Sequence, residues 1–309
     1  MKIFKPQFWQ KKNSLVSFLL LPLSLLLQLI IFLRCSFFNK TKFPIPIICV
    51  GNIYLGGTGK TPLSIEIVKI LEKLGKKTAI VKKSYRNHED EFELIKSKQV
   101  VLFKKSSRAL AINSSIKDKY DCVVLDDGFQ DPSIITNLNI VCFNAKQLIG
   151  NGMTIPSGPL RETLNSLKRC QIIMINGNKN LEFENKIKKK FNNISIYYSK
   201  YTPININKFV KKNLLAFAGI GNPENFFKLL EENKLNVIKK ISFPDHYKYS
   251  LHELNELINF SLKNNLKIVT TEKDFFRIKN FQLPQIESLN IKLNISNKEK
   301  FEKELTEYL

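Results

Sequence analysis

Cysteine and histidine are scarce in this sequence. Five cysteines occur in 309 residues, an odd number, and none forms a Cys-x-x-Cys pair. An odd count without regular spacing argues against a secreted disulfide-bonded protein and favours a reducing compartment. With three histidines and no cluster of Cys and His, we expect no zinc site.

Arginine is also scarce, although the chain is strongly basic. Lys and Arg together number 49 against 27 Asp and Glu, a formal net charge of +22, yet only six of the cations are Arg. A basic chain suggests nucleic acid, an anionic membrane surface or phosphorylated ligands as partners. No block of five like charges occurs, and the longest run is Lys188-Lys189-Lys190. We therefore expect no nucleic-acid partner.

Charge is missing altogether from Leu15 to Leu33. As a helix this stretch would be about 28 Å long, close to the bilayer core of about 30 Å. Lysines precede it and Arg34, Lys40 and Lys42 follow it, so the flanking charges favour neither orientation of a span. The absence of a small-x-small cleavage site disfavours a signal peptide. We expect residues 1–40 to form a helix in the cytoplasmic leaflet; a single span and a buried core helix are the alternatives.

After residue 41 apolar strand-like runs alternate with helical patterns. This alternation predicts βαβ units in an α/β fold, with a mostly parallel sheet. The polar stretch near 200–212 predicts a division into a lobe at 41–200 and a second, smaller α/β lobe at 201–309. The expected strands are Ile45–Val50, Thr78–Val81, Val100–Phe103, Cys122–Leu125, Ile140–Phe143, Ile172–Ile175, Leu214–Ala218, Ile238–Phe243 and Ile268–Thr270.

A glycine-rich loop follows the first strand. Gly56-Gly57-Thr58-Gly59-Lys60-Thr61 lies between that strand and a helical pattern, Pro62–Leu74. Such a loop turns backbone N–H groups toward a phosphate, and the helix amino end adds its dipole. Lys60 would reach the β- and γ-phosphates, and the Thr61 hydroxyl would bind Mg²⁺. One departure from GxxxxGK[ST] is Tyr54, where the first Gly is usual; the alternative is a plain glycine turn.

The run Cys122–Leu125 ends in Asp126-Asp127. Ligands of parallel α/β sheets bind at the carboxyl ends of strands, and Mg²⁺ prefers oxygen ligands. Together with the Lys60 loop, this pair predicts the second half of a nucleotide–magnesium site.

Three further motifs are ambiguous when taken alone. The segment 155–162, Ile-Pro-Ser-Gly-Pro-Leu-Arg-Glu, is either a rigid loop presenting Arg161 or a proline-rich surface turn. His246 in Phe-Pro-Asp-His-Tyr (243–247) is by itself more often structural. The segment Thr-Thr-Glu-Lys-Asp (270–274) lacks the Asn of the motif that recognises guanine in GTPases, so it does not predict a GTPase.

In this order the motifs resemble the tetraacyldisaccharide 4'-kinase (lipid A 4'-kinase) family over nearly the whole chain. The matches are Val50-Gly51-Asn52 with the loop 56–62, Asp126 to Gln130, Pro156 to Glu162, and the segments 217–227, 243–247 and 270–274, together with the N-terminal apolar helix.

The resemblance implies ATP-dependent phosphorylation of the 4'-hydroxyl of a tetraacyldisaccharide 1-phosphate, with Mg²⁺, at the cytoplasmic face of the inner membrane. It implies a general base, Asp90, paired with His246, and substrate contacts from Arg161, Gln130 and Asn52. In two places the chain departs from the family pattern. Glu89 replaces a Gly, and the segment 82–86 replaces Ser-Arg-Gly-Tyr-Gly, with Tyr85 the clear match.

Rival functions also follow from these residues. A membrane-tethered P-loop switch ATPase would hydrolyse ATP without a small-molecule acceptor, although Leu55 stands where partitioning ATPases carry Lys. A lipid-binding scaffold would not bind ATP, and a kinase for another glycolipid would use the same loop. We expect no obligatory protein partner.

Overall fold

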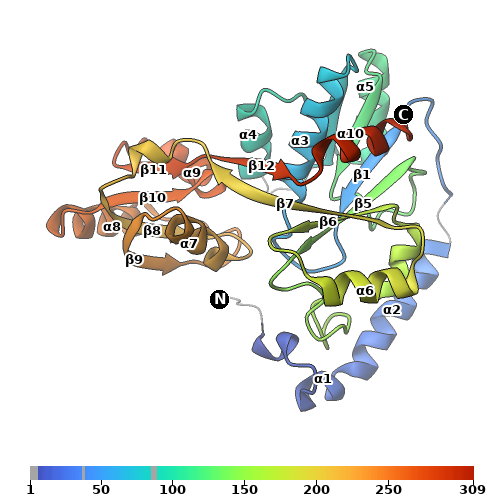
Figure 1. Ribbon diagram of the computed structural model, residues 1–309, viewed down its shortest axis with the longest axis horizontal. Helices are drawn as coiled ribbons and strands as arrows, with labels where there is room; N and C mark the ends of the chain where they lie inside the picture. The colour runs from blue at the N-terminus through green and yellow to red at the C-terminus, as the bar shows by residue number, and fades with distance from the viewer. Residues whose placement is uncertain (1–5, 37–38, 85–88) are drawn as a thin grey trace. The chain divides into compact units, whose positions relative to one another are not determined.

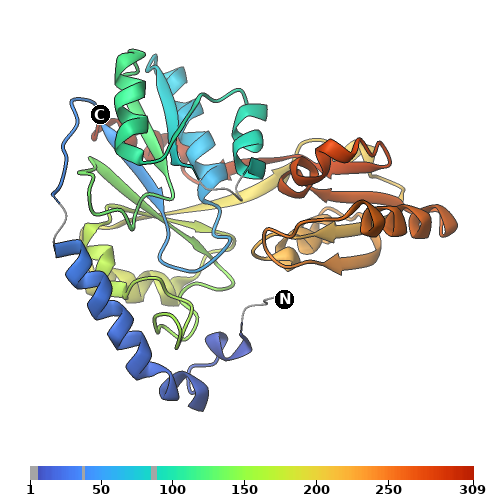
Figure 2. The same cartoon turned by 180° about the vertical axis from the view of Figure 1, so that it is seen from behind.

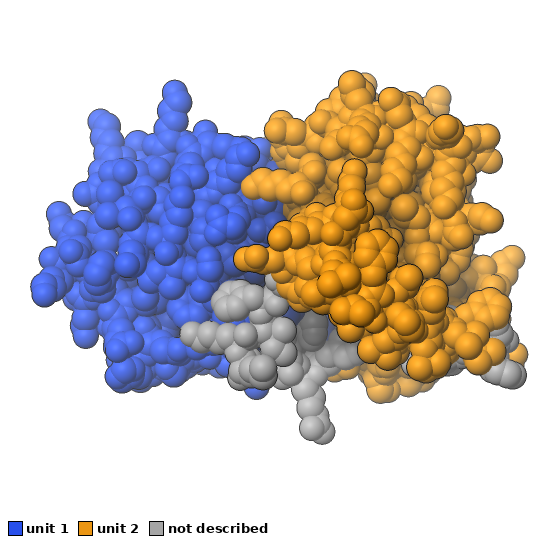
Figure 3. All heavy atoms as spheres, turned by 90° about the horizontal axis from the view of Figure 1, so that it is seen from below, with its two compact units in different colours: residues 1–4, 85–99, 201–293 blue, residues 5–84, 100–200, 294–309 orange. Residues whose placement is uncertain are grey.

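The computed structural model describes residues 6–36, 39–84 and 89–309. The chain forms two compact units, coloured in Figure 3. Of the described residues, the large unit comprises 6–36, 39–84, 100–200 and 294–309, and the small unit comprises 89–99 and 201–293. The sequence predicted a division into 41–200 and 201–309. Among the described residues, the units differ from that division at 89–99 and 294–309, and the boundaries at 200 and 293 fall inside two strands.

The larger of the two sheets has eight strands. Neighbouring pairs from β3 to β7 are parallel, and the central strands are buried along their whole length. A strand that is buried on both faces of a sheet needs apolar side chains at every position, so its sequence is a continuous apolar run. In spatial order the strands are β12 (Ile291–Ile295), β7 (Ser195–Pro203), β6 (Ile172–Asn176), β5 (Leu138–Asn144), β1 (Ile47–Gly51), β4 (Cys122–Asp126), β2 (Thr78–Lys83) and β3 (Leu102–Lys105).

Helices cover both faces of this sheet (Figures 1 and 2). One apolar cluster joins alternate strand residues to side chains of α5 and α6. On α3, an ion pair between Glu66 and Lys298 holds α10, with the Lys Nζ and Glu Oε1 2.8 Å apart. The helices of this unit are α3 (Lys60–Lys73), α5 (Arg108–Lys117), α6 (Leu181–Lys190) and α10 (Lys298–Thr306), with a 3₁₀ turn η2 (Leu164–Arg169).

The N-terminal apolar stretch forms two helices, α1 (Leu15–Leu19) and α2 (Leu21–Ser36), after a short turn η1 (Gln7–Gln10). Pro22 lies in the first turn of α2, where proline is tolerated. In the part of the chain that the structure describes, no helix has both the length and the apolar character to cross a membrane.

The small unit has a four-stranded parallel sheet in the order β11 (Ile286–Leu289), β10 (Lys267–Thr271), β8 (Asn213–Ala218) and β9 (Asn236–Ser242). Two apolar clusters lie against it, one containing residues of α7 and the other residues of α8. Its helices are α4 (Glu89–Ser97), α7 (Pro223–Glu232), α8 (Leu251–Lys263) and α9 (Glu272–Ile278), with turns η3 (Ile206–Lys208) and η4 (Lys279–Phe281).

The predicted fold class is confirmed, because a mostly parallel α/β sheet is accompanied by a second, smaller α/β unit. The predicted division into domains stays a prediction. Of the segments compared with known motifs above, Tyr85 and its neighbours 86–88 lie outside the described residues.

Candidate active site

The phosphate loop joins β1 to α3 and is shaped by one buried side chain. Asn52 is fully buried, and its Nδ2 donates to the Tyr54 carbonyl (2.7 Å), the Gly56 carbonyl (3.2 Å) and the Thr58 hydroxyl (3.0 Å). Gly59 precedes the helix with φ of +92°, a left-handed conformation that favours glycine. The loop therefore takes a fixed shape at the amino end of α3.

Tyr54, where the usual motif has glycine, has a structural task. Its ring is buried, its hydroxyl accepts a hydrogen bond from Gln10 Nε2 (2.7 Å), and its backbone forms a bridge with Leu160. The loop turn itself comes from Gly56, with φ of +108°, and from Gly59. The Tyr54 side chain thus ties the loop to Gln10, and its backbone ties the loop to the segment that carries Arg161.

Thr61 and Asp126 meet at the carboxyl ends of β1 and β4. The Thr61 hydroxyl donates to Asp126 Oδ2 at 2.8 Å, and the ammonium of Lys82, from the end of β2, lies 2.7 Å from the same oxygen. Asp126 is fully buried, and no described residue donates a hydrogen bond to its Oδ1. The result is a buried carboxylate with one oxygen held and the other without a donor.

Asp127 lies among cations. Its Oδ1 is 3.4 Å from Lys60 Nζ and 3.1 Å from Arg161 Nη1, and its backbone carbonyl accepts from Arg108 Nη2 (2.5 Å). Burial favours the protonated acid, but the charges of Lys60, Arg161, Lys82 and Arg108 together lower the pKa of Asp127 to about 2. Asp127 is therefore ionised at neutral pH.

Arg161 is held beside the loop by backbone and side-chain bonds. Its N–H donates to the Ile53 carbonyl (2.7 Å), and its Nη1 also donates to Gln130 Oε1 (3.2 Å). Gln130 Nε2 in turn donates to the Asn52 carbonyl (2.8 Å) and to Glu162 (3.1 Å). The structure thus brings together Asn52, Gln130 and Arg161, the three residues predicted to contact substrate, at the phosphate loop.

A second polar cluster lies in the small unit and contains Asp90, the first-turn residue of α4. Asp90 is buried, and its Oδ2 accepts from Arg277 Nε (2.9 Å) and Nη2 (2.6 Å). The Arg277 Nη1 donates to Asp274 Oδ1 (2.7 Å) and to the Gly219 carbonyl (2.6 Å). Burial works against the charge of Arg277, but Asp274 and Asp90 outweigh it and raise the pKa of the guanidinium.

His246 borders this cluster. Its Nδ1 is 3.9 Å from Asp90 Oδ2 and 3.5 Å from Arg277 Nη2, and its Nε2 is 3.9 Å from Asp245 Oδ1. Burial, with a contribution from Arg277, lowers the pKa of His246 in spite of the nearby Asp245 and Asp90 carboxylates. The predicted pair of Asp90 and His246 is therefore adjacent, within loose ion-pair distance.

No motif predicted a role for Lys82, Arg108 or Arg277. Lys82 lies in β2 and is the first residue of the segment 82–86, where the chain departs from the family pattern, and Arg277 lies in α9 after the segment 270–274. Arg277 is 187 positions from Asp90, so no local pattern connects them. Asp274 carried a signal, since it ends the segment 270–274, and its Oδ2 accepts from the Gly219 N–H (3.0 Å) and the Thr271 hydroxyl (2.7 Å).

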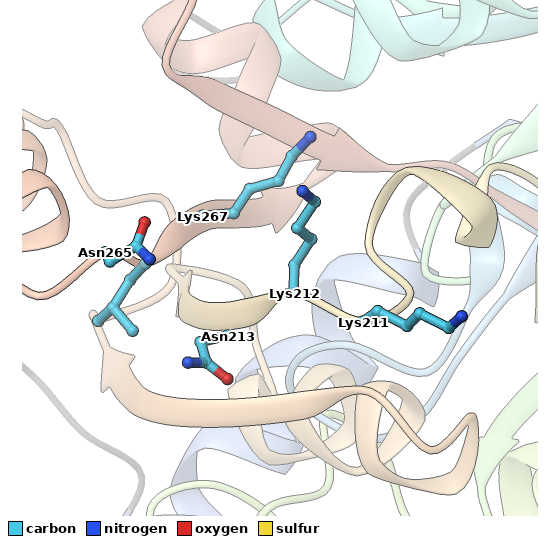
Figure 4. A pocket seen from close by; sticks show the side chains of 6 residues that line it. Lys211, Lys212, Asn213, Asn265 and Lys267 are labelled. Carbon is cyan, nitrogen blue, oxygen red and sulfur yellow. The ribbon is translucent and has the colours of Figure 1, made fainter.

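A surface hollow in the small unit belongs to neither cluster (Figure 4). Asn213 and Lys267 line it at the first residues of β8 and β10, with Lys211, Lys212, Asn265 and Leu266 around them. Gly219 and Thr271 lie at the opposite, carboxyl ends of the same strands. The hollow thus lies at the amino ends of these strands, opposite the carboxyl ends where Asp274 lies.

The sheet, the loop and the Thr61–Asp126 pair together define a nucleotide-binding protein of the P-loop α/β class. Residues 16–101 and 89–309 match the family model described as Tetraacyldisaccharide-1-P 4'-kinase. The chain belongs to this family, as its motifs predicted.

Curated relatives carry the same name. A Tetraacyldisaccharide 4'-kinase from Pelagibacter ubique (strain HTCC1062) is 44% identical over 316 residues, covering 100% of this chain and 98% of the relative. One from Rickettsia canadensis (strain McKiel) is 32% identical, covering 96% of this chain and 94% of the relative. The chain thus spans nearly the full length of both.

A solved structure shares the fold. The crystal structure of the "apo" form of LpxK from Aquifex aeolicus in complex with ATP aligns with a TM-score of 0.74 at 23% identity. The alignment covers 95% of this chain and 99% of that one. At this identity the likeness supports the fold assigned above.

Proposed function

We propose that this chain transfers the γ-phosphoryl group of ATP to the 4'-hydroxyl of a tetraacyldisaccharide 1-phosphate, a step of lipid A biosynthesis. The observation that carries the proposal is the Thr61 hydroxyl bonded to Asp126 beside the Lys60 loop, in a chain that belongs to the 4'-kinase family from residue 16 to residue 309.

The phosphate loop provides the ATP half of the reaction. The loop from Gly56 to Gly59 directs backbone N–H groups at the β- and γ-phosphates, and Lys60 adds a positive charge. In the structure Lys60 Nζ lies 3.4 Å from Asp127 Oδ1. When ATP binds, its phosphates replace this carboxylate as the partner of Lys60. Arg161, held by Asp127 and Gln130, contributes a second cation toward phosphate of the nucleotide or of the lipid.

Thr61 and Asp126 fit a magnesium site. A hydroxyl and a buried carboxylate with an unpartnered oxygen are hard ligands of the kind Mg²⁺ takes. Among the described residues, no group of three or more His, Cys, Asp or Glu could hold a metal unaided. Mg²⁺ bound there would use phosphate oxygens and water as its other ligands and would neutralise charge on the transferred group. Asp127, which is ionised at neutral pH and pairs with Lys60 of the loop, adds a negative charge next to this site.

Asp90 provides the proton half of the reaction. The described residues donate hydrogen bonds to its Oδ2 alone, and Oδ1 is the oxygen that accepts the proton of the sugar hydroxyl. The hydroxyl oxygen then bonds to the γ-phosphorus, the bond to the β–γ bridging oxygen breaks, and ADP leaves with the electron pair. His246 has a lowered pKa, so it stays neutral at neutral pH, and it orients the Asp90 carboxylate.

The N-terminal helices provide the membrane contact. Ser17, Ser24 and Gln28 lie at helical spacing and face the protein, where Ser24 Oγ bonds to the Thr154 carbonyl (3.0 Å) and Ser157 Oγ (2.8 Å). The outward side is apolar and exposed, comprising Leu15, Val16, Phe18, Leu19, Leu23, Leu25, Leu26, Leu27, Leu29, Ile30, Ile31, Phe32 and Leu33. Such a surface suits a leaflet, with Lys11, Lys12, Lys40 and Lys42 exposed near its ends for anionic headgroups.

A transfer assay in detergent micelles tests the proposal. The protein is incubated with Mg²⁺, γ-labelled ATP and tetraacyldisaccharide 1-phosphate, and the lipid is extracted. We expect label in the lipid with the natural chain, none with Lys60→Ala, and little with Asp90→Asn although that variant still binds ATP. ATP hydrolysed while the lipid stays unlabelled would overturn the acceptor assignment in favour of a switch ATPase.

A further inference from the structure

Lys82 is a buried lysine at the end of β2, only 4% exposed. In the register of β2 and β4, Val81 pairs with Leu125, so Lys82 and Asp126 are the next residues along two neighbouring strands. The Lys82 ammonium lies 2.7 Å from Asp126 Oδ2. A lysine is rarely buried to this extent unless a carboxylate compensates its charge.

The Asp126 carboxylate is suited to bind a metal cation. It is fully buried, Thr61 and Lys82 both contact Oδ2, and no described residue donates to Oδ1. Thr61 is also the residue that would bind Mg²⁺ beside the nucleotide. The ammonium therefore sits on the carboxylate that a divalent cation would use.

We propose that Lys82 is an internal counter-ion that occupies Asp126 in the nucleotide-free protein and competes with the divalent metal ion that accompanies ATP. The inference deepens the proposed function, on which it depends only for ATP and a divalent cation as ligands. Lys82 is a positioning residue, because it acts through Asp126 and not on the reacting atoms.

Two physical effects point the same way. A divalent ion near Thr61 and Asp126 meets the repulsion of an ammonium a few ångströms away, and this repulsion is strong where water is excluded. Because Oδ1 and Oδ2 belong to one carboxylate, a metal ion on Oδ1 also weakens the Lys82–Asp126 ion pair on Oδ2. Removing the ammonium should therefore strengthen metal binding on both counts.

The alternative role for Lys82 is a direct ligand of the ATP phosphates. The two roles predict opposite effects of removing Lys82 on metal-dependent ATP binding. A phosphate ligand strengthens ATP binding with or without metal, so its removal weakens both. A competitor of the metal weakens metal-dependent binding, so its removal lowers the Mg²⁺ concentration that is needed.

The test compares Lys82→Met with the natural chain and with Lys105→Met. Lys105 is exposed at the end of the neighbouring strand β3, so its variant loses the same net charge away from Asp126. ATP binding is measured by calorimetry over a Mg²⁺ titration and in EDTA. Mn²⁺ binding in the presence of ATP is followed separately by electron paramagnetic resonance.

We expect Lys82→Met to lower the half-saturating Mg²⁺ and Mn²⁺ concentrations by about tenfold or more. Lys105→Met should leave them unchanged. The metal-free Lys82→Met protein should melt at a lower temperature than the natural chain, because Asp126 loses its counter-charge, and Mg²⁺ with ATP should raise its melting temperature by a larger increment.

An unchanged or raised metal requirement in Lys82→Met would overturn the inference, and weakened ATP binding in EDTA would assign Lys82 to the phosphates. If Lys82→Met does not fold, Lys82→Gln keeps a hydrogen-bond donor without the charge and is read by the same criteria. These measurements need no lipid. A shifted metal requirement without label transfer would therefore refute only the proposed acceptor.

Discussion

At the residue scale, Lys60 and His246 serve the proposed reaction in different ways. Lys60 belongs to the loop that binds the phosphates, whereas His246 acts through Asp90. Phosphoryl transfer depends mainly on positioning and charge neutralisation. We expect Lys60→Ala to lower kcat/KM by at least about 10³-fold, and His246→Ala by at most about 10²-fold. Steady-state kinetics of both variants decide this, and equal losses would contradict the ranking.

Asp127 links stability to acid pH. Its pKa is lowered to about 2, so its ion pairs with Lys60 and Arg161 favour the folded state above the unfolded pKa of about 3.8 and are lost as the pH falls toward 2. The carboxylate is one-third exposed, and with allowance for solvent screening we expect Asp127→Asn to cost about 1–2 kcal/mol at neutral pH.

Urea unfolding of Asp127→Asn and the natural chain from pH 7 to pH 3 measures this contribution. The difference in the free energy of unfolding should stay constant down to about pH 4 and shrink below it. A difference that changes between pH 7 and pH 5 and is flat below pH 4 would assign the effect to another group.

Residue roles were predictable where the chain concentrates them in one segment. The loop from Gly56 to Thr61 and the pair Asp126-Asp127 could be read because strand, glycine turn and acid follow a local pattern. Lys82 and Arg277 could not, because each acquires its role from a partner distant in sequence. Arg277 meets Asp90 across 187 positions, and Lys82 meets Asp126 across two parallel strands.

At the element scale, the turn after β8 packs against the Asp274 cluster without space for a side chain. A Cβ on Gly219 would lie 2.7 Å from the Tyr249 hydroxyl oxygen, 3.1 Å from Asp274 Oδ1 and 3.2 Å from the Pro244 carbonyl oxygen. We expect Gly219→Ala to destabilise the protein by about 1–3 kcal/mol in denaturant unfolding.

A double-mutant cycle identifies the cause. Tyr249→Phe removes the hydroxyl that the new methyl group would meet, so Gly219→Ala should cost less in that background than in the natural chain. Strictly additive losses would mean that the contact with Tyr249 is not responsible.

The outward side of α2 is expected to bind membranes independently of nucleotide. Leu25 and Leu29 are exposed and one helical turn apart. The Leu25→Asp/Leu29→Asp variant should lose at least about tenfold in affinity for anionic phospholipid vesicles, since charge is costly in the interface and buried apolar area is lost. Its melting temperature and ATP binding should not change.

Co-sedimentation with vesicles provides the readout. Leu262→Asp, at an exposed leucine on α8, is the matched control and should bind like the natural chain. Equal vesicle binding by the α2 variant and the control would remove these helices from the membrane contact.

Elements were predictable to the extent that burial leaves a pattern in the sequence. Strands buried on both faces, such as β1 and β4, appear as continuous apolar runs. By contrast, β7 and β12 are edge-side strands of mixed exposure and were not anticipated. The helix α4 was missed as well, because three acidic residues at its start look like a solvated loop, although Asp90 among them is buried.

At the scale of the whole molecule, one chain carries two sets of groups. The large unit supplies the phosphate loop with Thr61 and Asp126, and the small unit supplies Asp90 with Arg277. In the proposed transfer, the first set binds the donor phosphate and the second accepts the proton of the hydroxyl. The order of motifs made the family predictable even though the placement of residues 89–99 in the small unit was not.

The position of the new phosphate on the lipid distinguishes a 4'-kinase from other phosphotransferases and from an ATPase. Tetraacyldisaccharide 1-phosphate is converted with unlabelled ATP and Mg²⁺, and the product is examined by ³¹P nuclear magnetic resonance. We expect a second phosphate monoester on the 4'-oxygen, with one ADP formed per lipid. A diphosphate at the 1-position, or ADP formed with the lipid unchanged, would contradict it.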